Sequence, residues 1–212
     1  MARSIRYLIK KTSNNLLKNR NARRVKKYVT LSGTAQTIGP RAMVCLYDGA
    51  TKENVVLHEH CELFGVINCH ADGKVIMHPW SKIGTGAKIN AVNRVEIGKD
   101  TAIATGVEII DNNNHPINPD DRRYMRHTPH GSRERLPRYS ANAPIVIGEN
   151  VWVGSYSRIQ KGVTIGDNAI IASHSVVTHD VPANAIAAGN PAKIVKTDID
   201  KKTTPIFPLN NN

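Results

Sequence analysis

His115 is the residue of this chain whose type and setting best suit proton transfer. It lies in the segment Asp111–Pro116, which contains three consecutive asparagines and interrupts an otherwise regular pattern of apolar residues. Imidazole titrates near neutral pH, so it can take up a proton and return it. Pro116 favours an extended backbone at His115, which would project the ring from a loop. We therefore expect His115 to be a general acid–base residue; the simpler alternative is a surface histidine, one of nine.

The remaining histidines and the cysteines do not predict a metal site. His58 and His60 would share one face of a strand, but no third partner stands out in the sequence. Cys45, Cys61 and Cys69 are odd in number and form no C-x-x-C motif, which indicates neither a disulfide framework nor a thiolate metal site. We expect that no metal is required and that the protein works in a reducing, cytoplasmic setting.

Six unbroken hexapeptides occupy residues 147–182 and predict the fold that must position His115. Small or β-branched residues stand four positions after each repeated apolar residue. A period of six matches neither an α-helix nor a single strand. It predicts a three-sided coil whose apolar interior is buried only by stacking on neighbouring coils, an all-β solenoid. The repeated apolar residues are Ile147, Val153, Ile159, Ile165, Ile171 and Val177.

A less regular form of the period extends the solenoid towards the N-terminus. Apolar residues keep step within three runs, residues 57–75, 77–89 and 97–109. Between these runs the register slips by two residues, which predicts a bulged or elongated turn at a corner. A charged loop with several prolines, residues 111–146, then interrupts the repeat. Loops of this length inside compact repeat domains are commonly functional.

The charge is concentrated at one end of the chain. The net charge is +12, but residues 1–47 hold eleven Lys or Arg and no acid, so residues 48–212 are nearly neutral. We therefore expect a basic, partly helical N-terminal segment (1–47), a solenoid domain (48–197) that contains the loop, and a C-terminal tail (198–212).

The N-terminal segment has the pattern of a basic amphipathic helix over residues 3–28. Its apolar stripe could pack on the solenoid or a neighbouring subunit, or it could make peripheral contact with the inner face of a membrane through residues 1–28. Flotation with anionic liposomes, with and without residues 1–28, distinguishes these alternatives. Few aromatic residues interleave with the charges, so we expect no nucleic acid partner. No apolar run is long enough to span a membrane.

Three features together resemble a known family: the sequence IGENVWVG at residues 147–154, the hexapeptides, and the sequence GNPAK at residues 189–193. Over about residues 57–197 the chain resembles the hexapeptide-repeat acyltransferases, most closely the maltose, galactoside and polysaccharide O-acetyltransferases. This resemblance implies a left-handed parallel β-helix with an N-terminal helical segment and one long inserted loop. It also implies a homotrimer with active sites between subunits.

The same resemblance implies roles for particular residues. His115 matches the catalytic histidine, which would activate an acceptor hydroxyl for direct attack on the thioester of acetyl-CoA. The backbone N–H at Ser155 would stabilise the oxyanion. His179 stands where related enzymes often have lysine, and Trp152 is expected to pack at a coil corner. The further residues implied in binding acetyl-CoA are Ser173, Thr178, Lys193 and Lys196.

The acceptor is the least determined part of this interpretation. Asn90 lies at one of the register slips, where it could bind a sugar hydroxyl or serve as an ordinary turn residue. We expect an acetyl-CoA-dependent O-acetyltransferase that acts on a sugar or saccharide precursor. The alternatives are an N-acetyltransferase of an amino sugar, a non-catalytic β-helix scaffold, and a metal-dependent carbonic anhydrase.

Overall fold

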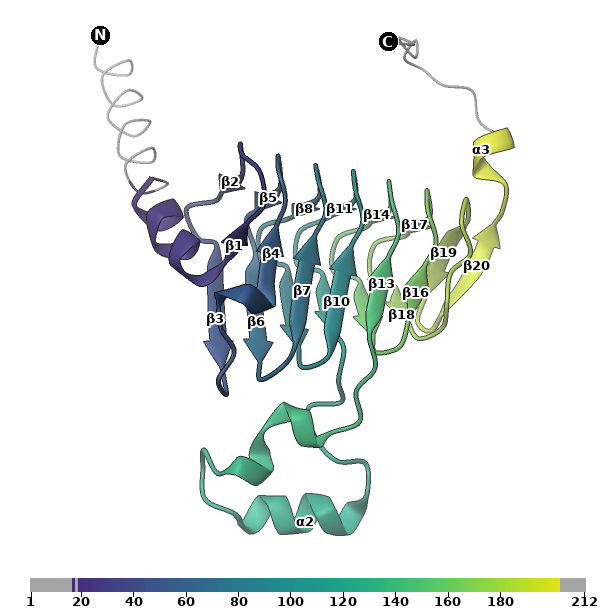
Figure 1. Ribbon diagram of the computed structural model, residues 1–212. Coiled ribbons are helices and arrows are strands. Elements are labelled where there is room, and N and C mark those ends of the chain that lie inside the picture. Colours follow the sequence, from purple (N-terminus) through teal and green to yellow (C-terminus); the bar gives the residue numbers. More distant parts are fainter. Residues whose placement is uncertain (1–16, 18, 203–212) are drawn as a thin grey trace, which may run out of the picture.

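The chain folds into a left-handed parallel β-helix, as predicted, with one insertion that projects from one corner (Figure 1). The structure, a computed structural model, describes residue 17 and residues 19–202. Three parallel sheets form the sides of a prism, and the chain passes through them in turn. All strand pairs are parallel except the last, β19 with β20.

The strands are short because each one spans a single side of the prism. The first sheet, sheet A, consists of β1 (Thr30–Leu31), β4 (Val55–Leu57), β7 (Lys74–Met77), β10 (Arg94–Ile97), β13 (Ile145–Ile147) and β16 (Thr164–Ile165). Sheet B consists of β2 (Thr37–Ile38), β5 (Glu62–Leu63), β8 (Lys82–Ile83), β11 (Ala102–Ile103), β14 (Trp152–Val153), β17 (Ile170–Ile171), β19 (Ile186–Gly189) and β20 (Ala192–Lys196). Sheet C consists of β3 (Met43–Tyr47), β6 (Val66–His70), β9 (Lys88–Ala91), β12 (Glu108–Ile110), β15 (Arg158–Gln160) and β18 (Val176–Val177).

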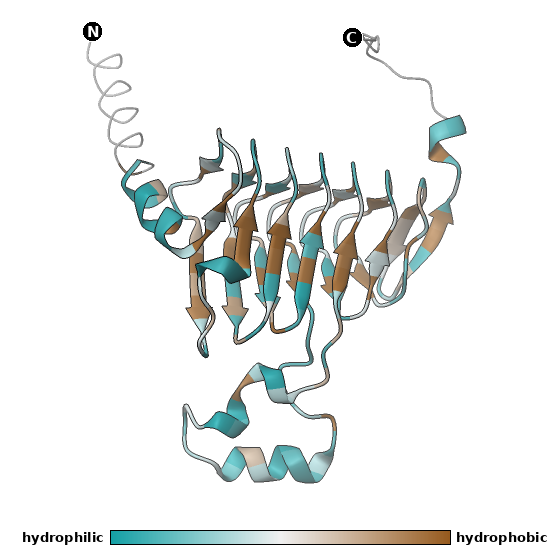
Figure 2. Ribbon diagram, viewed as in Figure 1, coloured by the Kyte–Doolittle hydropathy of each residue, from teal (hydrophilic) through white to brown (hydrophobic). Residues whose placement is uncertain are grey.

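The interior is a set of aliphatic columns that run along the prism. In sheet C, Ile109 pairs with Ile89 on one side and with Ile159 on the other, and all three are at most 1% exposed. Neighbours along each strand point outwards, because side chains alternate between the two faces of a strand. The hydropathy colouring shows apolar strands around the lumen and a largely hydrophilic insertion (Figure 2).

The two-residue slip at Val75–Met77 lies within a strand and not at a corner. Val75 and Met77 both lie on β7 and both are fully buried, with Ile76 between them on the outer face. At the second slip, Ala91 on β9 and Val95 on β10 supply additional inward residues. The predicted bulged or elongated corners are therefore largely replaced by longer strands, since two added residues restore the inward direction of the next side chain.

Corner residues adopt left-handed backbone conformations and stack from coil to coil. Asn150, Asn168 and Asn184 have φ of 52°, 60° and 55°. The Asn150 side-chain amide donates to Asn168 Oδ1 at 2.9 Å, and Asn168 donates to Asn184 at 2.8 Å. At the same corner of earlier coils, the rings of His60 and Trp80 stack with centroids 3.9 Å apart. Asparagine tolerates this backbone region well, so the ladder stabilises a sharp turn in each coil.

The solenoid begins earlier than the predicted boundary at residues 47 and 48. Its first coil starts at Thr30, so β1, β2 and β3 belong to the same three sheets as the rest. Residues 19–25 are helical, and their Val25 is 1% exposed within the core. The Asn21 amide donates to the carbonyls of Gly39 at 2.8 Å and Ala42 at 3.0 Å. This part of the segment therefore caps the first coil, in agreement with the packing alternative.

The insertion contains its own helices, although the sequence pattern predicted only a loop. They are α2 (Pro119–His127) and two 3-10 helices, Arg133–Arg135 and Pro137–Tyr139. Asn118 caps α2 by accepting from the backbone N–H of Asp120 at 2.8 Å. The insertion ends at residue 144, two residues before the predicted limit, because β13 begins at Ile145. At the other end of the chain, the predicted tail includes α3 (Ile199–Lys202).

Ile109→Ala tests whether the column in sheet C carries the stability of the solenoid. Removing a fully buried isoleucine between Ile89 and Ile159 is expected to lower the free energy of unfolding by about 2–5 kcal/mol. The measurement is equilibrium unfolding in urea. Thr164→Ala on the outer face of sheet A is the control and should change stability by less than about 1 kcal/mol. Equal effects of the two substitutions would contradict this role.

Candidate functional site

The two ends of the insertion are tied together in a short neck at the end of sheet C. The backbone N–H of Asn113 donates to the carbonyl of Ala141 at 3.0 Å, and the N–H of Ala143 donates to the carbonyl of Asp111 at 3.0 Å. Asn112 and Asn142 form an antiparallel bridge between these bonds. The neck therefore leaves the solenoid with a defined geometry, although it lies outside the repeated coils.

Asp111 anchors this neck through a carboxylate that is fully buried. Its oxygens accept hydrogen bonds from the backbone N–H of Val92 at 3.0 Å, the N–H of Asn93 at 2.8 Å and the Asn112 amide at 3.0 Å. Burial raises the pKa of Asp111, and these hydrogen bonds offset part of the rise. The carboxylate thus fastens the start of the insertion to the corner of the preceding coil.

His115 follows directly in a tight turn and is exposed. The Asn112 side chain accepts from the backbone N–H of Asn114 at 2.8 Å, and Asn114 has a left-handed φ of 62°. The N–H of His115 donates to the carbonyl of Asn113 at 2.7 Å. The Asn114 amide nitrogen lies 3.2 Å from His115 Nε2. Because an amide N–H can only donate, this contact fits the tautomer in which Nε2 carries no proton and has the lone pair that a general base uses.

A polar pocket of about 420 Å³, which we call the asparagine pocket, lies beside this turn. Asn90 and Asn114 both line it, so the structure brings the predicted acceptor residue next to the turn that carries His115. Asn90 lies on the outer face of β9 and not at a corner; its Oδ1 accepts from the Asn68 amide at 2.7 Å. Other residues that line the pocket include His70, Glu108, Pro137, Arg158 and Gln160.

Ser155 and Ser173 lie together at the corner between sheets B and C, which is not the corner that carries the insertion. The N–H of His174 donates to the carbonyl of Ser155 at 2.9 Å, which places the two turns in adjacent coils. Ser155 is half-buried, and within residues 19–202 its backbone N–H makes no hydrogen bond to the chain. Gly154 allows this close approach, since a Cβ there would lie 2.6 Å from the Ser173 nitrogen. This N–H is available to a ligand.

The other residues implied in cofactor binding are spread over the end of the solenoid. Thr178 follows β18 at the same corner as the insertion, and its hydroxyl lies 2.9 Å from Nδ1 of His179. Lys193 and Lys196 are exposed on β20, which follows a cis Asn190–Pro191 peptide bond. These lysines are therefore accessible to an anionic group.

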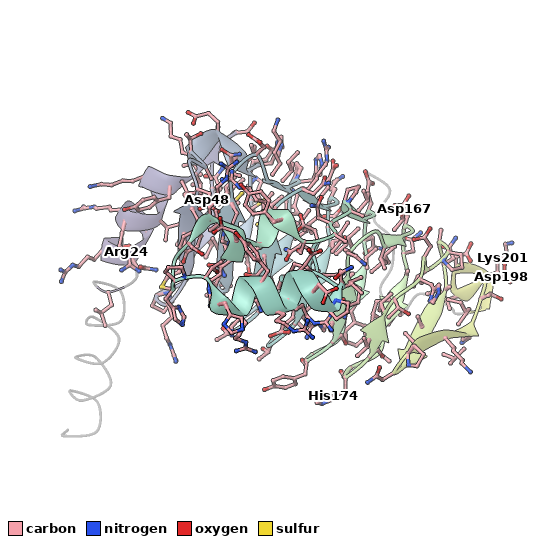
Figure 3. All side chains as sticks on the ribbon, turned by 90° about the horizontal axis from the view of Figure 1, so that it is seen from below. Arg24, Asp48, Asp167, His174, Asp198 and Lys201 are labelled. Carbon is pink, nitrogen blue, oxygen red and sulfur yellow. The ribbon has the colours of Figure 1, made fainter. Side chains whose placement is uncertain are left out.

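One chain does not bring His115 and Ser155 into a single site. The strands of sheet C run from the corner of Ser155 and Ser173 to the corner of the insertion. His115 and Ser155 therefore lie at opposite ends of these strands. Seen from below, α2 crosses the bottom of the solenoid, while His174, next to Ser173, projects from the side (Figure 3).

The structure also shows where Trp152 lies and how the residues that could bind a metal are arranged. The expectation that Trp152 packs at a corner is wrong. Trp152 lies on β14 and is 56% exposed, because its neighbour Val153 points inwards. Within residues 19–202 no group of three His, Cys, Asp or Glu is close enough to hold a metal ion. In the same part of the chain no helix is long and apolar enough to cross a membrane. The predicted membrane contact concerns residues 1–28, of which residues 1–16 and 18 lie outside the described residues, and it stays a prediction.

Several residues that shape the site were not predicted from the sequence. The anchoring role of Asp111 could have been suspected, because it is the last residue before the repeat breaks off. The pairing of Asn112 with Asn142 and the ion pair of Arg158 with Glu108, at 3.5 Å, join positions far apart in the sequence. No local pattern marks such pairs.

Comparisons with known proteins agree with this fold. A family model described as "Bacterial transferase hexapeptide (six repeats)" matches residues 144–179. Galactoside O-acetyltransferase of Escherichia coli K12 is 50% identical over 58 residues, which cover 27% of this chain and 29% of that enzyme. A protein of Saccharomyces cerevisiae, named provisionally as an acetyltransferase, is 34% identical over 119 residues, 56% of this chain and 61% of that protein. The chain thus spans less than two thirds of these relatives.

Solved structures share the fold over most of the chain. The polySia-specific acetyltransferase NeuO matches with a TM-score of 0.55 and 23% identity, covering 80% of this chain and 86% of that one. A hexapeptide-repeat acetyltransferase of Vibrio cholerae, complexed with acetyl-coenzyme A, matches with a TM-score of 0.57 and 20% identity over 84% and 76%. The N-acyltransferase AntD of Bacillus cereus, bound to dTDP and 3-hydroxybutyryl-CoA, matches with a TM-score of 0.62 and 14% identity over 84% and 87%. The resemblance to hexapeptide-repeat acyltransferases is confirmed.

Asp111→Ala should loosen the neck of the insertion. It leaves the buried N–H of Val92 and the part-buried N–H of Asn93 without an acceptor and removes one acceptor of the Asn112 amide, which is expected to destabilise the fold by about 1–3 kcal/mol. Equilibrium unfolding measures the loss, and limited proteolysis should cut the insertion faster.

Asp180→Ala is the matched control for this neck. Asp180 also accepts from a backbone N–H at a corner, that of Thr164 at 2.7 Å, but it is exposed. Its loss should have an effect below about 1 kcal/mol and leave the insertion protected. Unchanged stability and proteolysis in Asp111→Ala would rule out the anchoring role.

Proposed function

We propose that this hexapeptide-repeat protein is an O-acetyltransferase that moves an acetyl group from acetyl-CoA to a hydroxyl of a saccharide. The observation that carries the proposal is an exposed imidazole, His115, held by a buried anchor beside a polar pocket. The names of the relatives support the class of reaction, since they include a galactoside O-acetyltransferase and a polySia-specific acetyltransferase. A complex of one structural neighbour with acetyl-coenzyme A supports the donor.

In the proposed reaction His115 acts first as a base and then as an acid. Its Nε2 takes the proton of the acceptor hydroxyl as the oxygen forms a bond to the thioester carbon. The Ser155 N–H donates to the oxyanion that results. The tetrahedral intermediate collapses by breaking its carbon–sulfur bond, and the imidazolium returns the proton to the departing thiolate. The step therefore needs neither a metal ion nor an acyl-enzyme.

A neighbouring subunit would supply the half of the site that one chain lacks. His115 and Ser155 lie at opposite ends of sheet C, so side-by-side association would place the serine corner of one subunit near the insertion of the next. We therefore propose the homotrimer that the family resemblance implies, with three equivalent sites between subunits. Sedimentation equilibrium should give a mass of three chains; a strictly monomeric, active protein would contradict it.

The acetyl-CoA site is proposed along the C-terminal coils. Ser173 and Thr178 lie at the two ends of sheet C, and backbone groups of the last coils can pair with the amides of the pantetheine arm. Lys193 and Lys196 are exposed cations on β20 that would meet the phosphates. His179 contacts Thr178 at 2.9 Å and would take the place of a lysine there.

Transfer to an amine is the second candidate, supported by the structural likeness to the N-acyltransferase AntD. A protonated amine must lose its proton before it attacks, so the same histidine could serve both reactions. Thiol release from acetyl-CoA, measured with sugars that differ only by a hydroxyl or an amino group, separates the two. Faster release with the amino sugar would favour this alternative.

His115→Ala is expected to lower kcat for thiol release by about 10²–10⁴-fold, because general base catalysis contributes that much. The thermal unfolding temperature should stay the same, since the side chain is exposed. His130→Ala is the control and should keep normal turnover. His130 is an exposed histidine of the same insertion that does not line the asparagine pocket and makes none of the contacts described above. Near-normal kcat in His115→Ala with the fold intact would exclude the mechanism.

The double substitution of Lys193→Ala with Lys196→Ala should raise KM for acetyl-CoA while kcat changes little. Loss of two exposed charge contacts with phosphate, at about 0.2–1 kcal/mol each, predicts an increase of roughly twofold to thirtyfold. The effect should shrink at high salt, because exposed charges are screened. Lys74→Ala on the outer face of β7 is the control. An unchanged KM would mean that the nucleotide end of acetyl-CoA does not bind at these lysines.

A further inference from the structure

His115 stands in the chain between two residues that line different pockets, a position that we call the seam. The asparagine pocket is on the solenoid side, and a second pocket of about 370 Å³ lies within the insertion. Asn114 lines the first and Pro116 lines the second, so the residue between them stands at the boundary. The 3-10 helix Pro137–Tyr139 repeats this arrangement, with Pro137 in the first pocket and Tyr139 in the second.

The second pocket, which we call the tyrosine pocket, combines aromatic faces with charged groups. Asp121, Tyr124 and Met125 stand at i, i+3 and i+4 on α2, so they share one face of this helix. Tyr139 and Glu134 line the pocket from the later part of the insertion. Tyr124 is 65% exposed and Tyr139 is 44% exposed, so both rings are accessible to a ligand.

Two arginines hold Tyr139 in position. The Arg133 side chain donates a hydrogen bond to the Tyr139 hydroxyl, which lowers the pKa of this phenol. The guanidinium of Arg138 lies 5.4 Å from the centre of the ring. Arg133, Glu134 and Asp121 make no ion pair within 4 Å in the part of the chain that the structure describes. The pocket therefore offers an ordered ring together with donors and acceptors.

Such a combination suits one unit of a carbohydrate. The C–H faces of a sugar ring pack on aromatic rings, and its hydroxyls pair with carboxylates and guanidinium groups. The asparagine pocket, with its amides, is suited to a second unit on the other side of His115. A hydroxyl of an acceptor that occupies both pockets would lie at the imidazole in the seam.

We propose that the tyrosine pocket is a second acceptor subsite, so that the preferred acceptor is an oligosaccharide chain and not a single sugar. This inference rests on the proposed function and specifies its acceptor. Sugar units bound in the tyrosine pocket hold the oligosaccharide, and the sugar unit beside His115 is acetylated.

Acceptor length provides the test. Wild-type turnover is measured by thiol release with two matched pairs: maltose against maltohexaose, and N-acetylneuraminic acid against its α2,8-linked hexamer. We expect a higher kcat/KM for at least one hexamer. Tyr124→Ala and Tyr139→Ala should lower kcat/KM for that hexamer by about threefold to tenfold each, as expected for loss of an aromatic contact, and leave the short acceptor unchanged. Tyr28→Ala, an exposed tyrosine near the first coil, should change neither.

Binding provides a readout that does not depend on transfer. Saturation-transfer NMR with each hexamer and the full chain should show contact with wild type that is weakened in Tyr139→Ala. Binding of this kind without thiol release would support the subsite and count against the proposed acetyl transfer. Equal kcat/KM for short and long acceptors, equal effects of the tyrosine substitutions on both lengths, or no binding of either hexamer would overturn the subsite.

Discussion

The stacking of inward-facing aliphatic side chains from one coil to the next is the constraint on which the structure depends. A column such as Ile89, Ile109 and Ile159 excludes water only if each coil returns the chain to the same register. Because strand side chains alternate with a period of two, additional residues are tolerated in pairs. The longer strands β7, β9 and β10 obey this rule, and the lumen remains apolar where the hexapeptide period is broken.

The same constraint explains why the insertion leaves the solenoid at a corner. A corner lies between two strands, so a long segment can be added there without disturbing the column of isoleucines on either side. The register of Ile109 with Ile159 is kept across the whole insertion. Asp111 makes this possible by satisfying backbone donors of the preceding corner and fixing the neck. A buried carboxylate is unfavourable by itself, and its several hydrogen bonds make the arrangement stable.

The insertion adds to the rigid solenoid a surface of a different character. The outer faces of the sheets are narrow and regular, while the insertion presents tyrosines, an arginine and carboxylates in the tyrosine pocket, which Pro116 also lines. The residues proposed to bind the donor lie on the regular coils at the C-terminal end of the solenoid, and only Ser155 and Ser173 lie at the far end of sheet C. In the proposed function, donor binding and acceptor recognition therefore belong to different parts of the chain, and the proposed association of subunits would bring them together.

The sequence by itself determined the fold class, because a period of six that buries two residues in each hexapeptide is compatible with few structures. It also singled out His115, since an interruption of a strict repeat is visible without any structure. The tertiary structure alone decided that the N-terminal coil begins at Thr30, that Asn90 faces the turn of His115, and that Ser155 lies at the opposite end of sheet C. These facts depend on which coils become neighbours and which way each side chain points. A local pattern cannot encode contacts between residues 20 to 50 positions apart.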